Sequence, residues 1–295
     1  MSQERLEASL DIDRRSAREI VQIIQEQDAL IAAAVAAECD RIAHAIDQIA
    51  DRLSHGGRLF YVGAGTSGRI AMLDASELPP TYGIDSSLVG VLMAGGERAF
   101  LHAVEGAEDD ESAAIDAVNA SVTSEDAVVG IAASGTTPFT VAAIRRANML
   151  GALTIGVTSN QDSPLAAEAD IAIAPQTGPE VIMGSTRMKS GTAQKLVLNT
   201  ISTGVMIRLG RVHSNLMIDM PATNEKLRSR AVRMVELAAG VSRPAAVQAM
   251  RDAGGNVKLA ALMANKRLPI EDARVLLASH GDNLRNALET SKIRV

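Results

Sequence analysis

The chain has 295 residues, of which 47% are hydrophobic and only 2% aromatic, and it carries a formal net charge of −6 at pH 7. The negative charge and the scarcity of stacking aromatics argue against nucleic-acid binding. Cys39 is the single cysteine, which excludes an intramolecular disulfide and a thiolate zinc cluster. Because residues 1–15 lack the apolar core of an export signal and no apolar run could cross a bilayer, we expect a soluble cytoplasmic protein.

Two amphipathic helices are expected first. Apolar residues recur every three or four positions over residues 16–27 and again over residues 28–54, which predicts a helix in each range. Gly56 and Gly57 end the second helix. Residues 1–57 therefore form a predicted N-terminal helical arm, which packs on its own domain or on a partner subunit.

A strand and a turn rich in small residues follow the arm. The apolar run 59–62 is typical of a buried strand. Gly65, Thr66 and Ser67 then lie at the start of a helix, where backbone N–H groups lack partners and the helix end is positive. Free N–H groups and short hydroxyl side chains suit a phosphate group.

The same turn has other interpretations. Residues 63–68, GAGTSG, also match the GxGxxG fingerprint of dinucleotide-binding folds. That fingerprint expects an acidic residue at the tip of the next strand. The next predicted strand, 88–93, ends instead in Ala-Gly-Gly, and Glu97 comes later. A phosphomonoester site is therefore favoured over a dinucleotide site and over a purely structural turn.

Carboxylates near this turn are candidates for acid–base chemistry. We expect the helix to run over about 68–76 and the proline pair 79–80 to end it, which holds Glu77 at a defined distance from the turn. An acidic cluster at the start of the next helix offers five further candidates, among which the residues themselves do not choose: Glu105, Glu108, Asp109, Asp110 and Glu111. Acidic residues are also common at such positions simply because they offset the helix dipole.

The strand–turn–helix pattern then recurs. A strand predicted at 128–132 leads into Ser134, Thr136 and Thr137, and a helix follows over 137–150. Both turns follow parallel strands, so they converge where open α/β sheets bind ligands. This recurrence is the strongest functional signal in the residues themselves.

Two more strands, at 153–157 and 171–174, complete the pattern. Alternating strands and helices of this length predict an α/β fold, a doubly wound parallel five-stranded sheet with helices on both faces. The segment 178–192 then brings Arg187 and Lys189 to the start of a long helix. Two cations beside hydroxyls can hold a phosphate or carboxylate, or they can be ordinary solvated charges at a helix start.

The pattern changes after Asn224. Short helices broken by Gly, Pro and Asn are predicted at 228–240, 244–253, 256–265, 270–279 and 283–289. We therefore expect three parts: the N-terminal arm over 1–57, a phosphate-binding α/β domain over 58–227, and a small all-helical domain over 228–295.

Six motifs, in this order, resemble the N-acetylmuramic acid 6-phosphate etherase family. They are GAGTSGR at 63–69, DASELPPTYG at 74–83, HAVEGAED at 102–109, GIAASGTTP at 130–138, GSTRMKSGTAQKLVLN at 184–199 and NLMIDMPATNEKL at 215–227. The similarity runs from about residue 10 to the C-terminus. It implies a sugar isomerase (SIS) domain followed by a small helical domain, a homodimer, and no metal or organic cofactor.

The resemblance implies a lyase that acts in bacterial cell-wall recycling. The family cleaves the lactyl ether of N-acetylmuramate 6-phosphate to N-acetylglucosamine 6-phosphate and D-lactate. A base removes the C2 proton, an acid protonates the departing lactate, and water adds across the resulting double bond; carboxylates can do both jobs. By resemblance, Glu77 matches the proton donor and Glu108 takes the complementary acid–base role.

The resemblance also places the substrate phosphate. It implies hydroxyl contacts from Thr66, Ser67, Ser134 and Thr137, together with nearby N–H groups. Two positions depart from the family pattern. Thr136 stands where an arginine is expected, which exchanges a cation for a hydroxyl, and Leu78 stands where a cysteine is usual.

Two other functions fit the same fold. One is a non-catalytic SIS-type sensor that binds a sugar phosphate and regulates a partner protein. The other is an aldose–ketose isomerase, for which His102 could help to open the sugar ring. Because both Glu77 and Glu108 are present, the etherase is favoured. The product separates the three: lactate, nothing, or a ketose phosphate.

Overall fold

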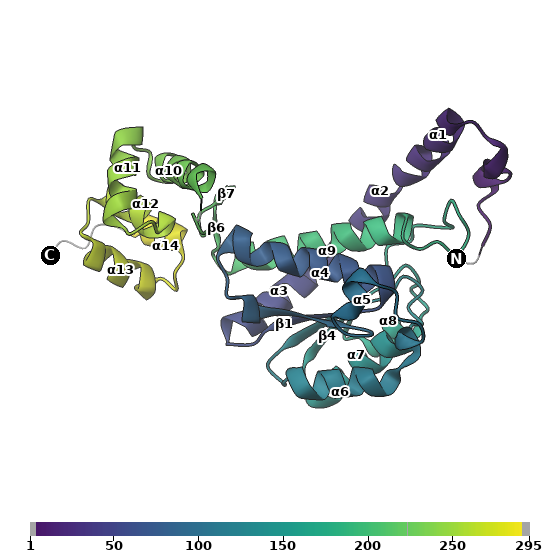
Figure 1. Cartoon of the computed structure of the whole chain (residues 1–295). Helices are drawn as coiled ribbons and strands as arrows, with labels where there is room; N and C mark the ends of the chain where they lie inside the picture. The colour runs from purple at the N-terminus through teal and green to yellow at the C-terminus, as the bar shows by residue number, and fades with distance from the viewer. Residues whose placement is uncertain (1–3, 223, 291–295) are drawn as a thin grey trace. The chain divides into compact units, whose positions relative to one another are not determined.

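The computed structural model describes residues 4–222 and 224–290 (Figure 1). Residues 1–3 of the predicted arm, Thr223 within the 215–227 motif and residues 291–295 of the predicted helical domain lie outside the described residues. The chain divides into two compact units. The first consists of residues 1–76 and 86–203, and the second of residues 77–85 and 204–295. The three-part division proposed from the sequence stays a prediction.

The first unit is built on a five-stranded parallel sheet with the strand order β2-β1-β3-β4-β5. The strands are β1 (Leu59–Gly63), β2 (Val89–Met93), β3 (Ala127–Ile131), β4 (Leu153–Val157) and β5 (Ile171–Ile173). Every residue of β1, β3 and β4 is buried. Their nearly continuous apolar sequences are what a parallel strand covered on both faces requires. The predicted doubly wound α/β fold is confirmed.

Helices cover both faces of this sheet (Figure 1). One face carries α6 (Glu111–Ser121), α7 (Pro138–Leu150) and α8 (Pro164–Glu168), and the other carries α3 (Cys39–Ser54), α4 (Gly65–Tyr82) and α9 (Lys189–Arg208). The shorter elements are η1 (Glu7–Ser9), η2 (Ile12–Arg14), α1 (Ala17–Asp28), α2 (Ile31–Ala36), η3 (Ser86–Leu88), α5 (Arg98–Leu101) and η4 (Ala107–Asp109). Phe139 and Ile144 of α7 pack on Val62 and Val128 of the sheet, so this helix is held by the core.

The prediction of a single helix over residues 28–54 is wrong, because the chain forms two helices there, α2 and α3. The break falls beside Glu38, whose side chain is 7% exposed. Its Oε2 accepts hydrogen bonds from the backbone N–H of Ala174 (3.2 Å) and from Arg41 (2.9 Å). The contact with Ala174 joins residues far apart in the sequence, so local periodicity could not reveal this break.

The prediction that the helix after β1 runs over about 68–76 and is ended by the proline pair is also wrong. Helix α4 begins at Gly65 and runs through Pro79 and Pro80 to Tyr82. Each proline removes one N–H donor and crowds the carbonyl four residues before it. Leu78 and Tyr82, on either side of the pair, are buried, and such tertiary packing overrides the local preference. The N–H of Gly83 donates to the carbonyl of Pro79 (2.9 Å), and Gly83, with φ +59°, ends the helix.

The second unit contains the five predicted short helices. They are α10 (Glu225–Ala239), α11 (Arg243–Asp252), α12 (Val257–Lys266), α13 (Ile270–Ser279) and α14 (Leu284–Glu289). Val235, Leu262 and Leu277 belong to their common core. An antiparallel pair, β6 (Val212–His213) and β7 (Leu216–Met217), precedes them and was not predicted. Across the described part of both units, none of the helices has the length and apolar character of a membrane span.

Candidate functional site

Three segments with predicted site residues leave the sheet at the same edge. Strand β1 pairs in parallel with β2 on one side and with β3 on the other, and the register sets Gly63 beside Met93 and Ile131. The carboxyl ends of the three strands therefore meet. The segment after β1 carries Thr66 and Ser67, the segment after β2 leads to Glu108, and the segment after β3 carries Ser134, Thr136 and Thr137.

The first turn of α4 presents unpaired backbone donors. The first helical hydrogen bond runs from the N–H of Gly68 to the carbonyl of Ala64 (3.2 Å), and the N–H groups of Gly65, Thr66 and Ser67 have no acceptor among the described residues. A Cβ on Gly68 would lie 2.2 Å from Met93 Sδ and 2.9 Å from the carbonyl oxygen of Gly63, so only glycine lets the helix start this close to the strands. Free N–H groups at a positive helix end form an anion site.

The second turn is held in place by its neighbours. Gly135 has φ +70°, and a Cβ there would lie 2.1 Å from Ser163 Oγ. Thr136 donates from its backbone N–H (3.2 Å) and from its hydroxyl (2.9 Å) to Ser134 Oγ. Thr137 is the N-cap of α7, and its side chain makes no capping hydrogen bond. The turn is thus rigid, and the Thr137 hydroxyl is not used by the helix.

A cavity of about 350 Å³ joins two of the predicted segments. It is lined by Thr66 and Ile70 of α4, by Gly191, Thr192 and Lys195 of α9, and by Arg187. The structure therefore brings Thr66 and Arg187 together, and their role in substrate binding stays a prediction. It adds Lys195, a second exposed cation, which the sequence interpretation missed. Lys195 comes four residues after Gly191 and three after Thr192, so all three lie on the same face of α9. This spacing is the one sequence signal that could have identified Lys195.

Lys189 lies elsewhere. The residue is 1% exposed, and its Nζ donates to Gln27 Oε1 (3.0 Å). Burial lowers the pKa of Lys189, although the nearby charges of Glu180 and Asp28 oppose that shift. The buried Glu180 carboxylate accepts from the backbone N–H groups of Lys189 and Ser190 (2.9 Å each), so the N-terminus of α9 already holds an anionic partner. The structure does not bring Lys189 into the cavity beside Arg187.

The two glutamates are both exposed and lie on different units. Glu108 lies in η4 of the first unit, and Glu77 lies on α4 in the segment that belongs to the second unit. Arg69 of α4 donates to the carbonyl oxygens of Phe100 (3.1 Å) and Ala99 (2.9 Å). Arg69 thereby anchors the chain between β2 and Glu108, a role that sequence interpretation missed although the residue is part of the GAGTSGR motif.

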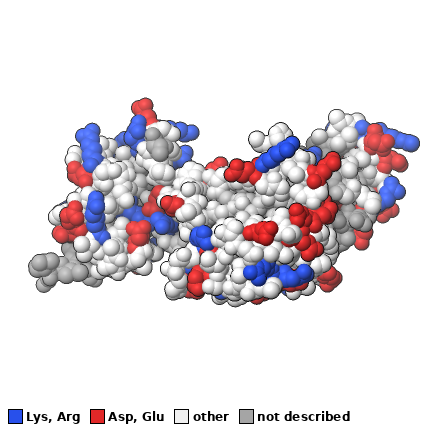
Figure 2. Space-filling model, turned by 60° about the horizontal axis from the view of Figure 1, so that its bottom comes forward, with Lys and Arg blue, Asp and Glu red and all other residues white. Residues whose placement is uncertain are grey.

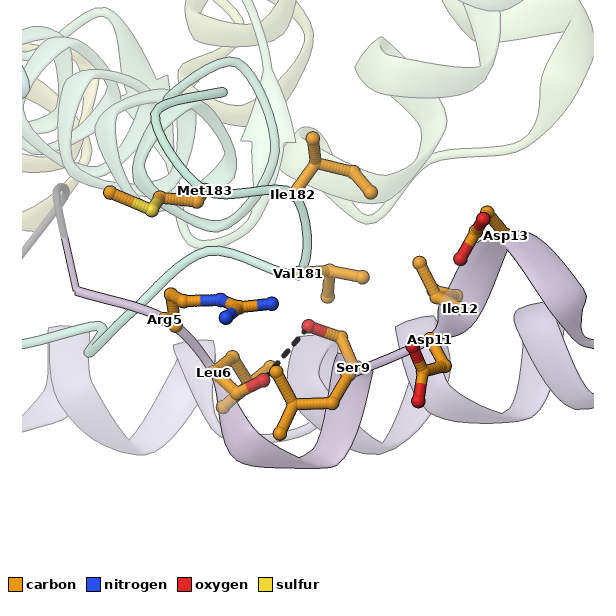
Figure 3. Close-up of a pocket in the computed structure, with 10 residues that line it drawn as sticks. Arg5, Leu6, Ser9, Asp11, Ile12, Asp13, Val181, Ile182 and Met183 are labelled. Carbon is orange, nitrogen blue, oxygen red and sulfur yellow. Dashed lines mark hydrogen bonds between the residues drawn. The ribbon is translucent and has the colours of Figure 1, made fainter.

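A second cavity, of about 220 Å³, is distinct from this site (Figure 3). It lies between the N-terminal segment 5–13 and residues 181–183 of the loop before α9. Figure 3 shows a hydrogen bond from Ser9 Oγ to the carbonyl of Leu6 (3.1 Å). None of the predicted site residues lines this cavity, so it does not enter the proposed chemistry.

The described residues form neither a continuous basic surface on the face shown in Figure 2 nor a cluster of metal-binding side chains. On the face shown in Figure 2, basic and acidic side chains of the described residues alternate without a continuous basic stripe. The described residues also include no group of three His, Cys, Asp or Glu side chains that could hold a metal ion. The site's chemistry is carried by hydroxyls, backbone N–H groups, exposed cations and carboxylates.

Comparisons with known proteins match this architecture. Residues 41–148 match the model of the glucokinase regulatory protein N-terminal SIS domain, and residues 103–203 match that of the SIS domain. A phosphoheptose isomerase from Francisella tularensis is similar in structure, with a TM-score of 0.52 and 19% identity over 65% of this chain and 98% of that chain. One from Neisseria gonorrhoeae gives a TM-score of 0.50 and 15% identity over 64% of this chain and 99% of that chain. These structures share the fold.

Relatives with much higher identity carry one name, N-acetylmuramic acid 6-phosphate etherase. A protein of Symbiobacterium thermophilum is 60% identical over 256 residues, which cover 87% of this chain and 85% of the relative. One of Salmonella typhi is 50% identical over 290 residues, 98% of both chains. One of Clostridium beijerinckii is 49% identical over 289 residues, 98% of this chain and 95% of the relative. The chain belongs to the N-acetylmuramic acid 6-phosphate etherase family.

Proposed function

We propose that this chain cleaves the lactyl ether of N-acetylmuramate 6-phosphate in amino-sugar recycling. The products are N-acetylglucosamine 6-phosphate and D-lactate, and one water is consumed. Identity of 49–60% to etherases over most of the chain supports this function. The structural observation that carries it is the row of three unpaired N–H groups beside Thr66 and Ser67, at the carboxyl edge of the sheet.

The substrate phosphate is proposed to bind at this edge. The N–H groups of Gly65, Thr66 and Ser67 and the hydroxyls of Thr66, Ser67, Ser134 and Thr137 supply hydrogen bonds to its oxygens. The Thr136 hydroxyl joins them by turning away from Ser134 Oγ, to which it otherwise donates. Arg187 lines the cavity with Thr66 and supplies positive charge. Lys189, the other predicted cation, is buried, donates to Gln27 Oε1 and does not line this cavity.

Glu77 and Glu108 are proposed to move the protons. In the open-chain sugar, the C2 proton is acidified by the adjacent aldehyde, and the ether oxygen lies on C3. Glu108 removes the C2 proton, and the C3–O bond breaks as Glu77 protonates the lactate oxygen. Water then adds its hydroxyl to C3 and its proton to C2 of the double bond. Such positioned acid–base catalysis contributes roughly 10²–10⁴-fold for each group.

Isotopes test this sequence of steps. We expect wild-type protein, given N-acetylmuramate 6-phosphate in D₂O that contains ¹⁸O-water, to place deuterium at C2 and ¹⁸O at C3 of the sugar product. The released lactate keeps the original ether oxygen. Label in lactate and none at C3 would contradict elimination, and the absence of any lactate would contradict the function.

One alternative has an observation in its favour. The match of residues 41–148 to a regulatory protein's SIS domain agrees with a non-catalytic sugar-phosphate sensor. Such a sensor binds its ligand at the same turns and needs neither glutamate. Binding of N-acetylmuramate 6-phosphate without release of lactate would favour it.

The active form is proposed to be a homodimer. Helix α1 buries none of its residues; its Val21 is 52% exposed, and Leu30, just after the helix, is 56% exposed. An apolar groove of about 400 Å³ is formed by α2, α3 and α9 and is lined by Ala32, Val35, Ala36, Cys39, Ile42, Ala43, Ile46, Leu196 and Thr200. A second copy of the chain would bury these surfaces. Light scattering on wild type and on Val35→Glu should give a dimer and a monomer, respectively.

The cytoplasm is the proposed location. The substrate is a charged sugar phosphate, and charged groups cross an apolar bilayer poorly. The single cysteine, Cys39, also leaves the chain without the disulfide framework that is common in exported proteins.

A further inference from the structure

Gln194 of α9 lies against the phosphate-binding turn and is incompletely satisfied. The residue is buried, with 2% of its surface exposed. Its Oε1 lies 3.0 Å from Ser67 Oγ, which joins α9 to the first turn of α4. Its Nε2 is buried and has no hydrogen-bond partner among the described residues.

The two ends of a carboxamide have the same shape, so oxygen and nitrogen are assigned from the hydrogen bonds that they can make. A half-turn of the Gln194 amide places Nε2 at 3.0 Å from Ser67 Oγ, where it donates a hydrogen bond. The position without a partner is then held by a carbonyl oxygen. A buried N–H without an acceptor is rarer in proteins than an under-satisfied carbonyl, so the rotated amide is the better arrangement.

This rotation changes what Ser67 can do. A serine hydroxyl has one hydrogen to donate and two lone pairs to accept with. When Oε1 of Gln194 faces Ser67, the Ser67 hydroxyl donates its hydrogen to Gln194. With the amide rotated, Ser67 accepts from Gln194 and keeps its hydrogen for another partner. Ser67 belongs to the same turn as the unpaired N–H groups of Gly65 and Thr66, and a phosphate oxygen is the acceptor that all of these donors share.

We propose that Gln194 is a positioning residue, which donates to Ser67 Oγ and thereby fixes the Ser67 hydroxyl as a hydrogen-bond donor to the substrate phosphate. This inference rests on the proposed phosphate site. It does not require the chain to be catalytic, since a sugar-phosphate sensor would use the same donor.

Binding of N-acetylglucosamine 6-phosphate, measured by calorimetry, tests the proposal without any need for turnover. Gln194→Met keeps the side-chain volume but leaves the Ser67 hydroxyl free to rotate, and we expect roughly 10-fold weaker binding. Gln194→Glu can only accept at neutral pH, so it takes the Ser67 hydrogen and adds negative charge. We expect it to weaken binding by roughly 100-fold. Gln48→Met, at an exposed position of α3, is the matched control and should bind as wild type does.

A double-mutant cycle separates positioning from a general structural effect. Ser67→Ala removes the donor itself, so adding Gln194→Met to Ser67→Ala should cost nothing more. In turnover assays, Gln194→Met should raise KM for N-acetylmuramate 6-phosphate and change kcat less than about threefold. The proposal would be overturned if the losses of binding free energy in the two single variants add in the double variant. It would also be overturned if Gln194→Met binds with the affinity of wild type. If wild type releases no lactate but the cycle shows coupling, the etherase assignment fails while this inference stands.

Discussion

A buried polar cluster around Asp74 in the first unit differs from a buried cluster around Lys258 in the second unit in how charge is satisfied. In the first unit, the Asp74 carboxylate is the only charged group of its cluster. It accepts from Tyr61 Oη (2.8 Å), Asn199 Nδ2 (2.6 Å) and Ser202 Oγ (3.0 Å). Burial first, and then the charge of Asp74, raise the pKa of Tyr61 well above its usual range, so this tyrosine stays a neutral donor.

In the second unit, charge is satisfied by charge. Lys258 Nζ, with the side chain 1% exposed, lies 2.6 Å from Asp219 Oδ2 and 2.8 Å from Asp282 Oδ2. Arg211 lies 3.3 Å from Asp219 and 3.7 Å from Asp282. Burial raises the pKa of Asp219, although Lys258 and Arg211 oppose that shift.

This difference determines how strongly the loss of one side chain destabilises each cluster. Removing one of three neutral donors leaves the Asp74 carboxylate with two others. Removing Lys258 leaves two carboxylates close together, one of them largely buried, with Arg211 as their remaining cation. Breaking a buried ion pair by removing one partner is costly because an uncompensated charge remains. Single substitutions should therefore be more damaging in the second cluster than in the first.

The largest effect is expected from Lys258→Met. The substitution keeps the volume of the side chain and removes the central cation, so the free energy of unfolding should fall by about 3–5 kcal/mol. Chemical unfolding followed by circular dichroism measures it. Lys226→Met, at an exposed position of α10, is the matched control and should change stability by less than about 0.5 kcal/mol. Equal stability of the two variants would remove the proposed contrast between the clusters.

A smaller loss is expected from Gly83→Ala, which acts on the backbone beside the charged cluster. Gly83 has φ +59°, and a Cβ there would lie 2.2 Å from the carbonyl oxygen of Asp219. Left-handed strain and the overlap together should cost about 2–4 kcal/mol. Gly240→Ala has similar strain, with φ +67°, but no atom within 4 Å, and should cost about 1 kcal/mol. If thermal unfolding shows the same loss of stability for both variants, the close approach of residue 83 to Asp219 does not contribute to the cost of Gly83→Ala.

The smallest effect at neutral pH is expected from Tyr61→Phe, about 1–2 kcal/mol for one buried hydrogen bond. Its clearer signature lies at alkaline pH. Because the pKa of Tyr61 is raised on folding, its stabilisation is complete below the pKa of about 10 in the unfolded chain and is lost as pH rises toward the folded value. Wild type should therefore lose up to about 1.4 kcal/mol per pH unit above pH 10.

Unfolding curves at several alkaline pH values check this. Tyr61→Phe should lack that slope, whereas Tyr82→Phe, at the other tyrosine of the chain, should keep it. The same slope in wild type and Tyr61→Phe would contradict the account of the first cluster.

Much of the fold follows from local sequence pattern. The apolar runs of β1, β3 and β4 predicted buried parallel strands, because every residue in them meets a helix or another strand. The break between α2 and α3 could not be predicted, since the contact between Glu38 and Ala174 is long-range. The passage of α4 through two prolines could not be predicted either, since it depends on the tertiary packing of buried neighbours such as Leu78 and Tyr82.

For the candidate site, local sequence pattern located the strand-to-helix turns and the residues in them. Thr66 and Arg187 line one cavity, and their role in binding stays a prediction. Lys189 shows the limit of that approach, because its hydrogen bond to Gln27 depends on where α1 packs. Gln194 could not be found either, since a glutamine in a helix has no distinctive pattern and its partner Ser67 lies 127 residues away. The roles of Glu77 and Glu108 stay predictions.

The most direct test of the account is the rate of lactate release from saturating N-acetylmuramate 6-phosphate by wild type, Glu77→Gln and Glu108→Gln. Both substitutions keep side-chain size and remove the ionisable group. The account predicts that each variant binds N-acetylglucosamine 6-phosphate with wild-type affinity and releases lactate at least about 10²-fold more slowly. Wild-type turnover by either variant would contradict the assignment of two catalytic carboxylates.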